Sequence, residues 1–214
     1  KRYRSQCNNN QSYNTNNQQN FINFSSHFIH LFILIGLMII YSVIMLLKYS
    51  KKNEKTIIKT AVSILRKGGL IIYPTETLYG IGCDATNKRA VAKVYKIKKR
   101  KRNLPVSILV SSKTMAKKYV SLSQKAIGKL PGRYTFILPV KRKLPVSKDM
   151  TGIRLPKHWC TKLTRALDKP IVSTSVNISK RKPLTDIKKI QKIFGSKIAL
   201  YIDQGKLTGP ATKV

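Results

Sequence analysis

Acidic side chains are scarce in this chain. Its 214 residues include 7 Asp and Glu against 43 Lys and Arg, which gives a formal net charge of +36. A charge of this size attracts polyanions such as RNA, nucleotides and acidic lipids. It does not by itself indicate nucleic-acid recognition, because a general excess of lysine produces the same field and the sequence has no RNA-binding motif with interleaved aromatic residues. Direct RNA contact and an unspecific basic surface therefore stay open as alternatives.

Cysteine is also rare, and two common phosphate-binding loops are missing. Cys7, Cys83 and Cys160 are odd in number, lie far apart and show no C-x-x-C spacing, so neither a zinc site nor a disulfide framework is indicated. This usage fits a reducing cytoplasm. The sequence contains no G-x-G-x-x-G loop and no Walker loop. Any phosphate binding would therefore depend on side chains and on turns at strand ends.

The first 47 residues divide into two segments. Residues 1–27 are rich in Asn and Gln, which predicts a disordered segment. Residues 28–47 carry no charged side chain, and ~20 apolar residues are enough for a transmembrane helix. The lysines that follow would keep the rest of the chain on the cytoplasmic side as a membrane-anchored domain. The alternative is that residues 1–44 are upstream sequence translated from a misplaced start, and that Met45 begins the protein.

From Glu54 onward the apolar pattern is that of an α/β domain. Ile58, Ala61 and Leu65 recur at helical spacing before a glycine stop. Further helices are predicted at 87–99, with Asn87 as its N-cap, and at 112–119, 123–130, 158–167 and 185–193. Strands are predicted at 70–73, 105–110, 133–140, 152–155, 171–173 and 197–202. Because the order mixes hairpin-like and helix-linked strands, we expect a single domain over 54–214. It would have one twisted mixed β-sheet with helices packed on it, rather than a Rossmann fold.

The segment from Gly68 to Asp84 carries the strongest functional signal. A short apolar strand ends at Pro74, which has no N–H for a strand ladder. Thr75, Glu76 and Thr77 follow at the strand end, where α/β proteins usually bind ligands, although ordinary turns have a similar composition. Glu76 is one of two glutamates in the chain. It would orient the turn hydroxyls or a basic side chain, and a direct contact with Mg²⁺ is the less favoured alternative.

Four more motifs follow this turn in a fixed order. They are Lys98-Lys99-Arg100, the stretch 131–136 (Pro-Gly-Arg-Tyr-Thr-Phe), the stretch 152–158 around Arg154, and the stretch 173–179 (Ser-Thr-Ser-Val-Asn-Ile-Ser). Together with the glycine pair and the Pro-Thr-Glu-Thr turn, this order resembles the YrdC family of threonylcarbamoyl-AMP synthases over roughly residues 54 to 212. The resemblance implies a YrdC-like fold for the predicted domain.

The chain departs from the family pattern at several positions. Lys101 stands where the family usually has proline, Gln204 where a second glycine is common, and Lys180 where a small residue is usual. Residues 209–214 look like the beginning of a family segment, P-S-T-V-V-D, that precedes a further strand and an Arg-Pro-Gly turn closing over ATP. This comparison predicts a domain that is truncated at its C-terminus.

The resemblance implies a nucleotidyltransferase. Family members convert L-threonine, bicarbonate and ATP into threonylcarbamoyl-AMP and pyrophosphate, and a downstream transferase moves the threonylcarbamoyl group onto the adenosine next to the anticodon of certain tRNAs. ATP is a substrate that would bring Mg²⁺ with it, and no metal site of the protein itself is expected. Such an enzyme would act in the cytoplasm.

The resemblance also assigns roles to residues. Lys98 and Arg100 offer a point charge and a planar guanidinium to triphosphate oxygens, although the register could slip by two because Arg102 is close. Ser175 and Asn177 would face the same side of an extended segment. These four residues are the expected catalytic and ATP-binding group. Three more residues are expected to bind L-threonine, with Arg154 pairing its carboxylate: Thr75, Arg154 and Ser173.

A second class of function stays open. A non-catalytic RNA-binding or ribosome-associated relative with the same fold would also explain the charge and the predicted C-terminal truncation. The four catalytic candidates favour the enzyme. A carbamoyl-phosphate-using maturation factor would need acylphosphatase and zinc-finger regions, and the sequence contains neither.

Overall fold

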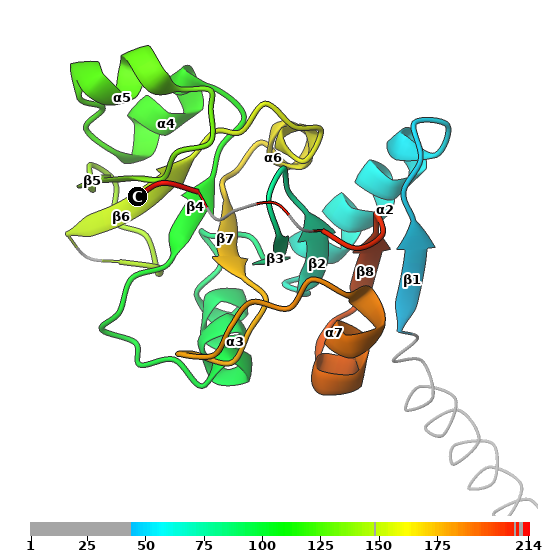
Figure 1. Cartoon of the computed structure of the whole chain (residues 1–214). Coiled ribbons are helices and arrows are strands. Elements are labelled where there is room, and N and C mark those ends of the chain that lie inside the picture. Colours follow the sequence, from blue (N-terminus) through cyan, green and yellow to red (C-terminus); the bar gives the residue numbers. More distant parts are fainter. Residues whose placement is uncertain (1–43, 148, 208, 210–211) are drawn as a thin grey trace, which may run out of the picture. The chain divides into compact units, whose positions relative to one another are not determined.

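An eight-stranded mixed β-sheet organises the part of the chain that the structure describes (Figure 1). The computed structural model describes residues 44–214 except residues 148, 208 and 210–211. The strands lie in the order β1-β8-β2-β3-β7-β4-β6-β5. Their bounds are β1 Met45–Lys48, β2 Ile71–Pro74, β3 Tyr79–Gly82, β4 Ser107–Leu109, β5 Phe136–Pro139, β6 Met150–Arg154, β7 Ile171–Ser175 and β8 Leu200–Asp203. The predicted mixed α/β sheet is confirmed.

Both strand directions occur in this sheet. The parallel pairs are β1 with β8, β8 with β2, and β4 with β6. The antiparallel pairs are β2 with β3, β3 with β7, β7 with β4, and β6 with β5. This order brings together three segments that are distant in sequence: the β2–β3 turn, the end of β7, where Ser175 lies opposite Gly80, and Arg154 of β6, whose side chain contacts Glu76 in the turn and Ser173 in β7.

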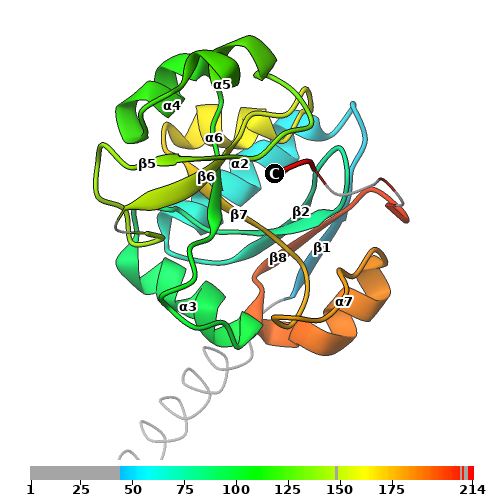
Figure 2. The same ribbon diagram turned by 60° about the vertical axis from the view of Figure 1, so that its left-hand side comes forward.

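Helices cover both faces of the sheet (Figures 1 and 2). They are α2 Glu54–Arg66, α3 Lys88–Lys98, α4 Lys113–Tyr119, α5 Gln124–Lys129, α6 Thr161–Leu167 and α7 Ile187–Phe194, with a short 3₁₀ turn, η1, at Gly195–Lys197. Neighbouring strand residues alternate between the two faces. Ile71 and Leu109 are buried with α2 and α6, whereas Ile72 and Ile108 are buried with α3 and α7.

Two helix ends form as the sequence predicts. The Asn87 side chain caps α3 by accepting hydrogen bonds from the backbone N–H groups of Arg89 at 3.0 Å and Ala90 at 3.1 Å. After α2, Gly68 adopts a φ of 72°, a left-handed conformation that glycine takes without steric cost. Gly68 therefore turns the chain from α2 toward β2.

The predicted membrane helix over residues 28–47 is wrong where the structure describes it. Met45–Lys48 form β1, which pairs parallel with β8, so the apolar side chains at the end of the predicted span belong to the sheet. Residues 28–43, and the predicted disordered segment 1–27, lie outside the described residues. Within residues 44–214, apart from the four not described, no helix is long and apolar enough to cross a bilayer. The compact unit begins at Ile44, ten residues before the expected domain start at Glu54.

Candidate active site

A cavity of about 290 Å³ lies at the strand ends where the three segments meet. Its lining includes hydroxyls from five separate segments: Thr77, Ser107, Thr135, Ser173, Ser175 and Thr212. Two guanidinium groups, those of Arg100 and Arg154, also line the cavity, and among the described residues no Asp or Glu side chain does. The cavity therefore offers two fixed positive charges and several neutral hydrogen-bonding groups.

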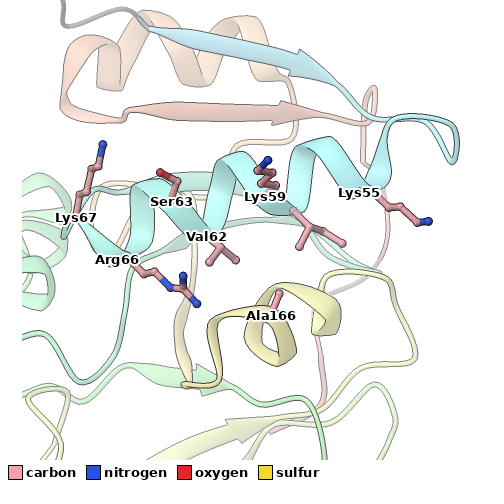
Figure 3. A pocket seen from close by; sticks show the side chains of 8 residues that line it. Lys55, Lys59, Val62, Ser63, Arg66, Lys67 and Ala166 are labelled. Atoms are coloured by element: carbon pink, nitrogen blue, oxygen red, sulfur yellow. The ribbon is translucent and has the colours of Figure 1, made fainter.

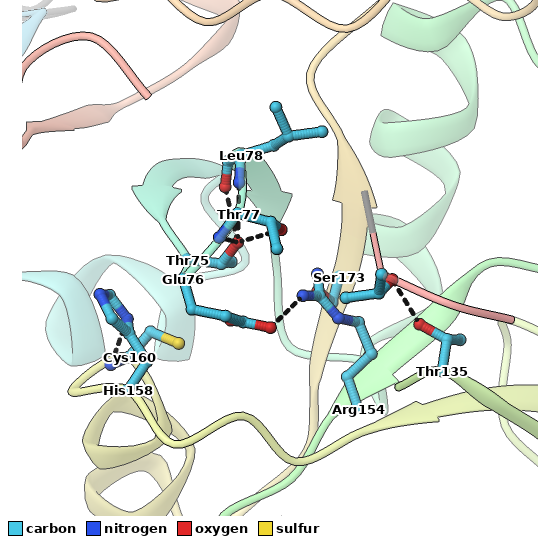
Figure 4. A network of polar contacts seen from close by, with 10 residues as sticks. Thr75, Glu76, Thr77, Leu78, Thr135, Arg154, His158, Cys160 and Ser173 are labelled. Atoms are coloured by element: carbon cyan, nitrogen blue, oxygen red, sulfur yellow. Dashed lines mark hydrogen bonds and ion pairs between the residues drawn. The ribbon is translucent and has the colours of Figure 1, made fainter. Parts of the chain in front are cut away.

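Arg154 is the last residue of β6 and is held from two sides (Figure 4). Its Nη2 donates to Glu76 Oε1 at 2.9 Å, and its Nη1 donates to Ser173 Oγ at 3.4 Å. The side chains of Arg154 and Glu76 are 12% and 14% exposed, so this ion pair is largely shielded from water. The remaining guanidinium donors are available to a carboxylate, which Arg binds through two N–H groups at once.

The turn between β2 and β3 is fixed by the hydroxyl of Thr75 (Figure 4). Thr75 Oγ1 donates to Leu78 O at 2.7 Å and accepts from the backbone N–H groups of Thr77 and Leu78. Thr75 is 2% exposed and does not line the cavity, whereas Thr77 does. The internal hydrogen bonds of the turn set the position of Glu76, which lies between these threonines.

Lys98, at the end of α3, holds the end of β7. Its side chain is 2% exposed, and its ammonium donates to Ser175 O at 2.5 Å, Asn177 Oδ1 at 2.6 Å and Asn177 O at 3.1 Å. Asn177 Oδ1 also accepts from the Ser175 hydroxyl at 3.0 Å. Burial, with a smaller effect of the nearby Arg100, lowers the pKa of Lys98 to about 8. Neither Lys98 nor Asn177 lines the cavity.

Arg100 reaches the cavity from the loop after α3. Lys99 ends this helix with a φ of 49°, and Arg100 follows directly. The Arg100 Nε donates to Leu104 O at 3.2 Å and its Nη2 donates to Pro105 O at 2.9 Å. These two bonds fix the guanidinium plane at the cavity edge beside Ser175.

Comparison with known proteins places the chain in a family. The family model for Sua5, YciO and YrdC, which carries the description "Telomere recombination", matches residues 63–213. The chain belongs to the Sua5/YciO/YrdC family. A relative from Methanocaldococcus jannaschii is 37% identical over 170 residues, which are 77% of this chain and 81% of that protein. A protein of Wigglesworthia glossinidia brevipalpis named threonylcarbamoyl-AMP synthase is 32% identical, over 70% of this chain and 84% of that protein.

Solved structures of the Sua5/YciO/YrdC family have the same fold. Sua5 of P. abyssi, crystallised with L-threonine, aligns with a TM-score of 0.69 and 26% identity over 77% of this chain. The chain spans about half of that protein, 51% of its length. E. coli YciO aligns with a TM-score of 0.69 and 26% identity, over 79% of this chain and 87% of the YciO chain. These alignments support the YrdC-like fold.

The structure brings together only some of the predicted site residues. Arg100, Arg154, Ser173 and Ser175 line the cavity. Lys98 and Asn177 lie behind it and contact Ser175 through hydrogen bonds, and Thr75 contacts Thr77. His158 is not among the lining residues, and burial lowers the pKa of its imidazole.

Several hydroxyl residues of the lining were not predicted as site residues: Thr77, Tyr79, Ser107, Thr135, Thr174 and Thr212. The close approach of Ser107 and Thr135 depends on Gly152, because a Cβ there would collide with the Ser107 side chain and come within 3.0 Å of Thr135 Cγ2. Gly152, in the predicted strand 152–155, is the sequence feature that could have indicated this close packing, since a glycine in a strand often marks a place where other groups approach the backbone closely.

Residues near the C-terminus complete the cavity wall. Thr135 N donates to Lys213 O at 2.8 Å, and Lys213 N donates to Arg133 O at 3.3 Å. The Thr135 and Thr212 hydroxyl oxygens lie 3.0 Å apart. Thr212 and Val214 therefore line the cavity as an added extended segment beside β5.

A larger and shallower hollow of about 640 Å³ lies between α2 and α6 (Figure 3). Its lining combines apolar side chains such as Val62 and Ala166 with exposed cations such as Lys55, Lys59 and Arg66. It has one hydroxyl, that of Ser63, and none of the motif residues shared with the family. The cavity at the strand ends is therefore the candidate active site.

Proposed function

We propose that this chain is a threonylcarbamoyl-AMP synthase. It would use L-threonine, bicarbonate and ATP to form threonylcarbamoyl-AMP and pyrophosphate. The observation that carries this proposal is the convergence of Arg154 and Ser173 with Arg100 and Ser175 in one cavity. The chain's similarity to a protein named threonylcarbamoyl-AMP synthase, and to Sua5 crystallised with L-threonine, supports the same reaction.

L-threonine would bind at the Arg154 end of the cavity. The guanidinium pairs the substrate carboxylate, and the nearby Ser173 hydroxyl offers a further hydrogen bond. Thr77 and Thr135 line the same cavity and offer hydroxyls to the substrate side chain or amine. Thr75 would act indirectly, without lining the cavity, by fixing the turn that carries Thr77.

ATP would bind at the Arg100 end. The Arg100 guanidinium and the Ser175 hydroxyl face the cavity and can hold phosphate oxygens. Lys98 and Asn177 hold the Ser175 segment in place and add the positive charge of the Lys98 ammonium nearby. Among the described residues the lining has no Asp or Glu side chain, and there is no cluster of three His, Cys, Asp or Glu side chains suited to a metal. We therefore propose that Mg²⁺ enters bound to ATP.

The reaction depends more on the positioning of its substrates than on general acid–base catalysis by side chains. The threonine amine attacks the bicarbonate carbon, forms an N–C bond and gives a carbamate with loss of water. A carbamate oxygen then attacks the α-phosphorus of ATP, the bond to the β-phosphate oxygen breaks, and pyrophosphate leaves. Two guanidinium groups that line one cavity can align these reactants and stabilise the developing negative charge. No covalent intermediate on the protein is involved.

Pyrophosphate release from ATP by the 214-residue chain tests this function. We expect release that requires both L-threonine and bicarbonate. Release without threonine, or no release from a folded protein, would contradict the synthase. Tight binding of tRNA in the second case would favour the RNA-binding alternative. We further propose a cytoplasmic enzyme whose product passes to a transferase that acts on tRNA.

Turnover should fall as the pH rises through about 8. Lys98 has a pKa of about 8, so it is protonated below this pH and neutral above it. The neutral amine has two N–H donors for three oxygens and carries no charge toward the phosphates. Lys98→Arg should remove this loss of turnover at high pH, because a guanidinium stays protonated across the range. The measurement is kcat/KM from pH 6.5 to 10 for both proteins, and an identical loss in Lys98→Arg would refute the assignment.

A further inference from the structure

We propose that Glu76 is a positioning residue that sets the ligand preference of the Arg154 end of the cavity. It orients the guanidinium and offsets its charge, so that a zwitterionic α-amino acid binds there in preference to an inorganic anion. This inference rests on the proposed function, because it concerns how the threonine end of the same cavity distinguishes ligands.

The position of Glu76 is fixed by its surroundings. The Thr75 hydroxyl closes the turn that carries it, through bonds to the backbone of Thr77 and Leu78. Glu76 Oε1 then accepts from Arg154 Nη2 at 2.9 Å, while Ser173 Oγ accepts from Nη1. Two points of attachment hold a planar group in one orientation. The guanidinium is therefore preorganised before a carboxylate enters, which reduces the entropic cost of binding.

The ion pair is largely removed from water. Glu76 Oε2 and Arg154 Nε are buried and have no hydrogen-bond partner within the part of the chain that the structure describes. Charges in such surroundings interact more strongly than surface charges do. Glu76 therefore offsets the charge of Arg154 more effectively than an exposed carboxylate would.

The other charges of the cavity determine how the Glu76–Arg154 ion pair affects ligand binding. Arg100 and Arg154 both line the cavity, and no Asp or Glu side chain of the described residues does, in a chain with a net charge of +36. Glu76, behind the lining, neutralises Arg154, whereas the Arg100 side chain, among the described residues, bonds to the backbone oxygens of Leu104 and Pro105 and to no carboxylate. The cavity thus has one end that favours anions and one that is neutral overall. An amino acid with no net charge suits the neutral end, whereas pyrophosphate, a product of the proposed reaction, is repelled by Glu76.

A purely structural counter-ion would behave differently. If Glu76 served only to satisfy a buried arginine, its replacement would lower the melting temperature without changing the relative affinities for an amino acid and an inorganic anion. The two roles therefore differ in a binding measurement, independently of stability.

The chain offers a matched control for this measurement. Glu54 is the other glutamate, it is also ion-paired, to Lys162, and its side chain is 16% exposed against 14% for Glu76. Glu54→Gln and Glu76→Gln therefore remove the same charge from side chains of similar exposure. The partner of Glu54, Lys162, is 52% exposed against 12% for Arg154, and only Glu76 contacts a cavity residue. Pyrophosphate alone, followed by calorimetry, serves as the anion probe, and steady-state kinetics give KM for L-threonine.

Glu76→Gln should raise KM for L-threonine roughly tenfold, change kcat less than threefold, and tighten pyrophosphate binding at least tenfold. Glu54→Gln should match the wild type in all three. The double variant Glu76→Gln/Arg154→Gln should lose the added pyrophosphate affinity, which assigns that affinity to Arg154. Unchanged pyrophosphate affinity in folded Glu76→Gln, or an equal gain in Glu54→Gln, overturns the proposal.

Glu76→Asp covers the case in which Glu76→Gln does not fold. It keeps the charge but shortens the side chain, so KM for threonine should rise while pyrophosphate affinity stays at the wild-type value. An unchanged KM in Glu76→Asp would overturn the positioning role. Failure of the proposed function is distinguishable, because a wild-type chain that makes no threonine-dependent product still reports the charge effect through pyrophosphate alone.

Discussion

Arg154→Gln is expected to lower kcat/KM for L-threonine about a thousandfold. The variant loses a charged, shielded contact to the substrate carboxylate, and removing one partner of such a pair costs ~2–5 kcal/mol. About 4 kcal/mol corresponds to roughly three orders of magnitude. Pyrophosphate release at varied threonine concentration measures the effect. A value of kcat/KM within threefold of the wild type would remove Arg154 from the threonine site.

The single variant also leaves Glu76 as a shielded carboxylate without its cation, which destabilises the fold. Glu76→Gln/Arg154→Gln removes both charges and should melt close to the wild type while remaining inactive toward threonine. Arg165→Gln, at an exposed position of α6, removes one positive charge away from the cavity and should leave kinetics unchanged. The pair of controls separates loss of the carboxylate contact from loss of folded protein.

Lys98→Ala is expected to abolish turnover and to destabilise the protein as well. The substitution leaves three oxygens, Ser175 O, Asn177 O and Asn177 Oδ1, without their shared donor and opens a cavity at a position that is 2% exposed. Unsatisfied buried groups cost ~1–3 kcal/mol, and a loss of about 3 kcal/mol lowers Tm by roughly 10 °C in a domain of this size. The end of β7 that carries Ser175 would also lose its fixed position.

Lys96→Ala is the matched control, since Lys96 is an exposed lysine on the same helix, two residues earlier. It should keep the wild-type Tm and turnover. Thermal unfolding and pyrophosphate release are measured on both variants. A Lys98→Ala protein with wild-type Tm and no activity would instead place the ammonium in direct contact with the triphosphate, as the sequence alone predicts.

The buried position of Lys98 could not be predicted from the sequence. The K-x-R motif identifies the right region, but the burial of Lys98 depends on the carbonyls at residues 175 and 177, almost eighty positions later. No local pattern states whether a lysine faces a ligand or a neighbouring strand. The family motifs predicted which segments meet, whereas the division between residues that line the cavity and residues behind it required the packed structure.

The strand β3 could not be predicted from its own residues either. Its sequence, Tyr-Gly-Ile-Gly, is typical of a turn, because glycine weakens isolated strands. The ring of Tyr73 lies across it, and a Cβ on Gly82 would come within 2.7 Å of Tyr73 Cε1. The glycines therefore provide room for a neighbouring strand's side chain. β2, the Asn87 cap and the Gly68 stop depend on local chemistry, and they were predictable from the sequence.

The pairing of β1 with β8 has a consequence for how the chain folds. Met45 lies opposite Leu200, so the first strand of the compact unit finds its partner only after more than 150 further residues have been synthesised. β8 also separates β1 from β2 in the finished sheet. Until β8 is inserted, the adjoining edges of β1 and β2 are open, and open edges promote pairing with other chains. We therefore expect a slow closing step in folding, dominated by non-local contacts, during which incomplete chains are prone to aggregate.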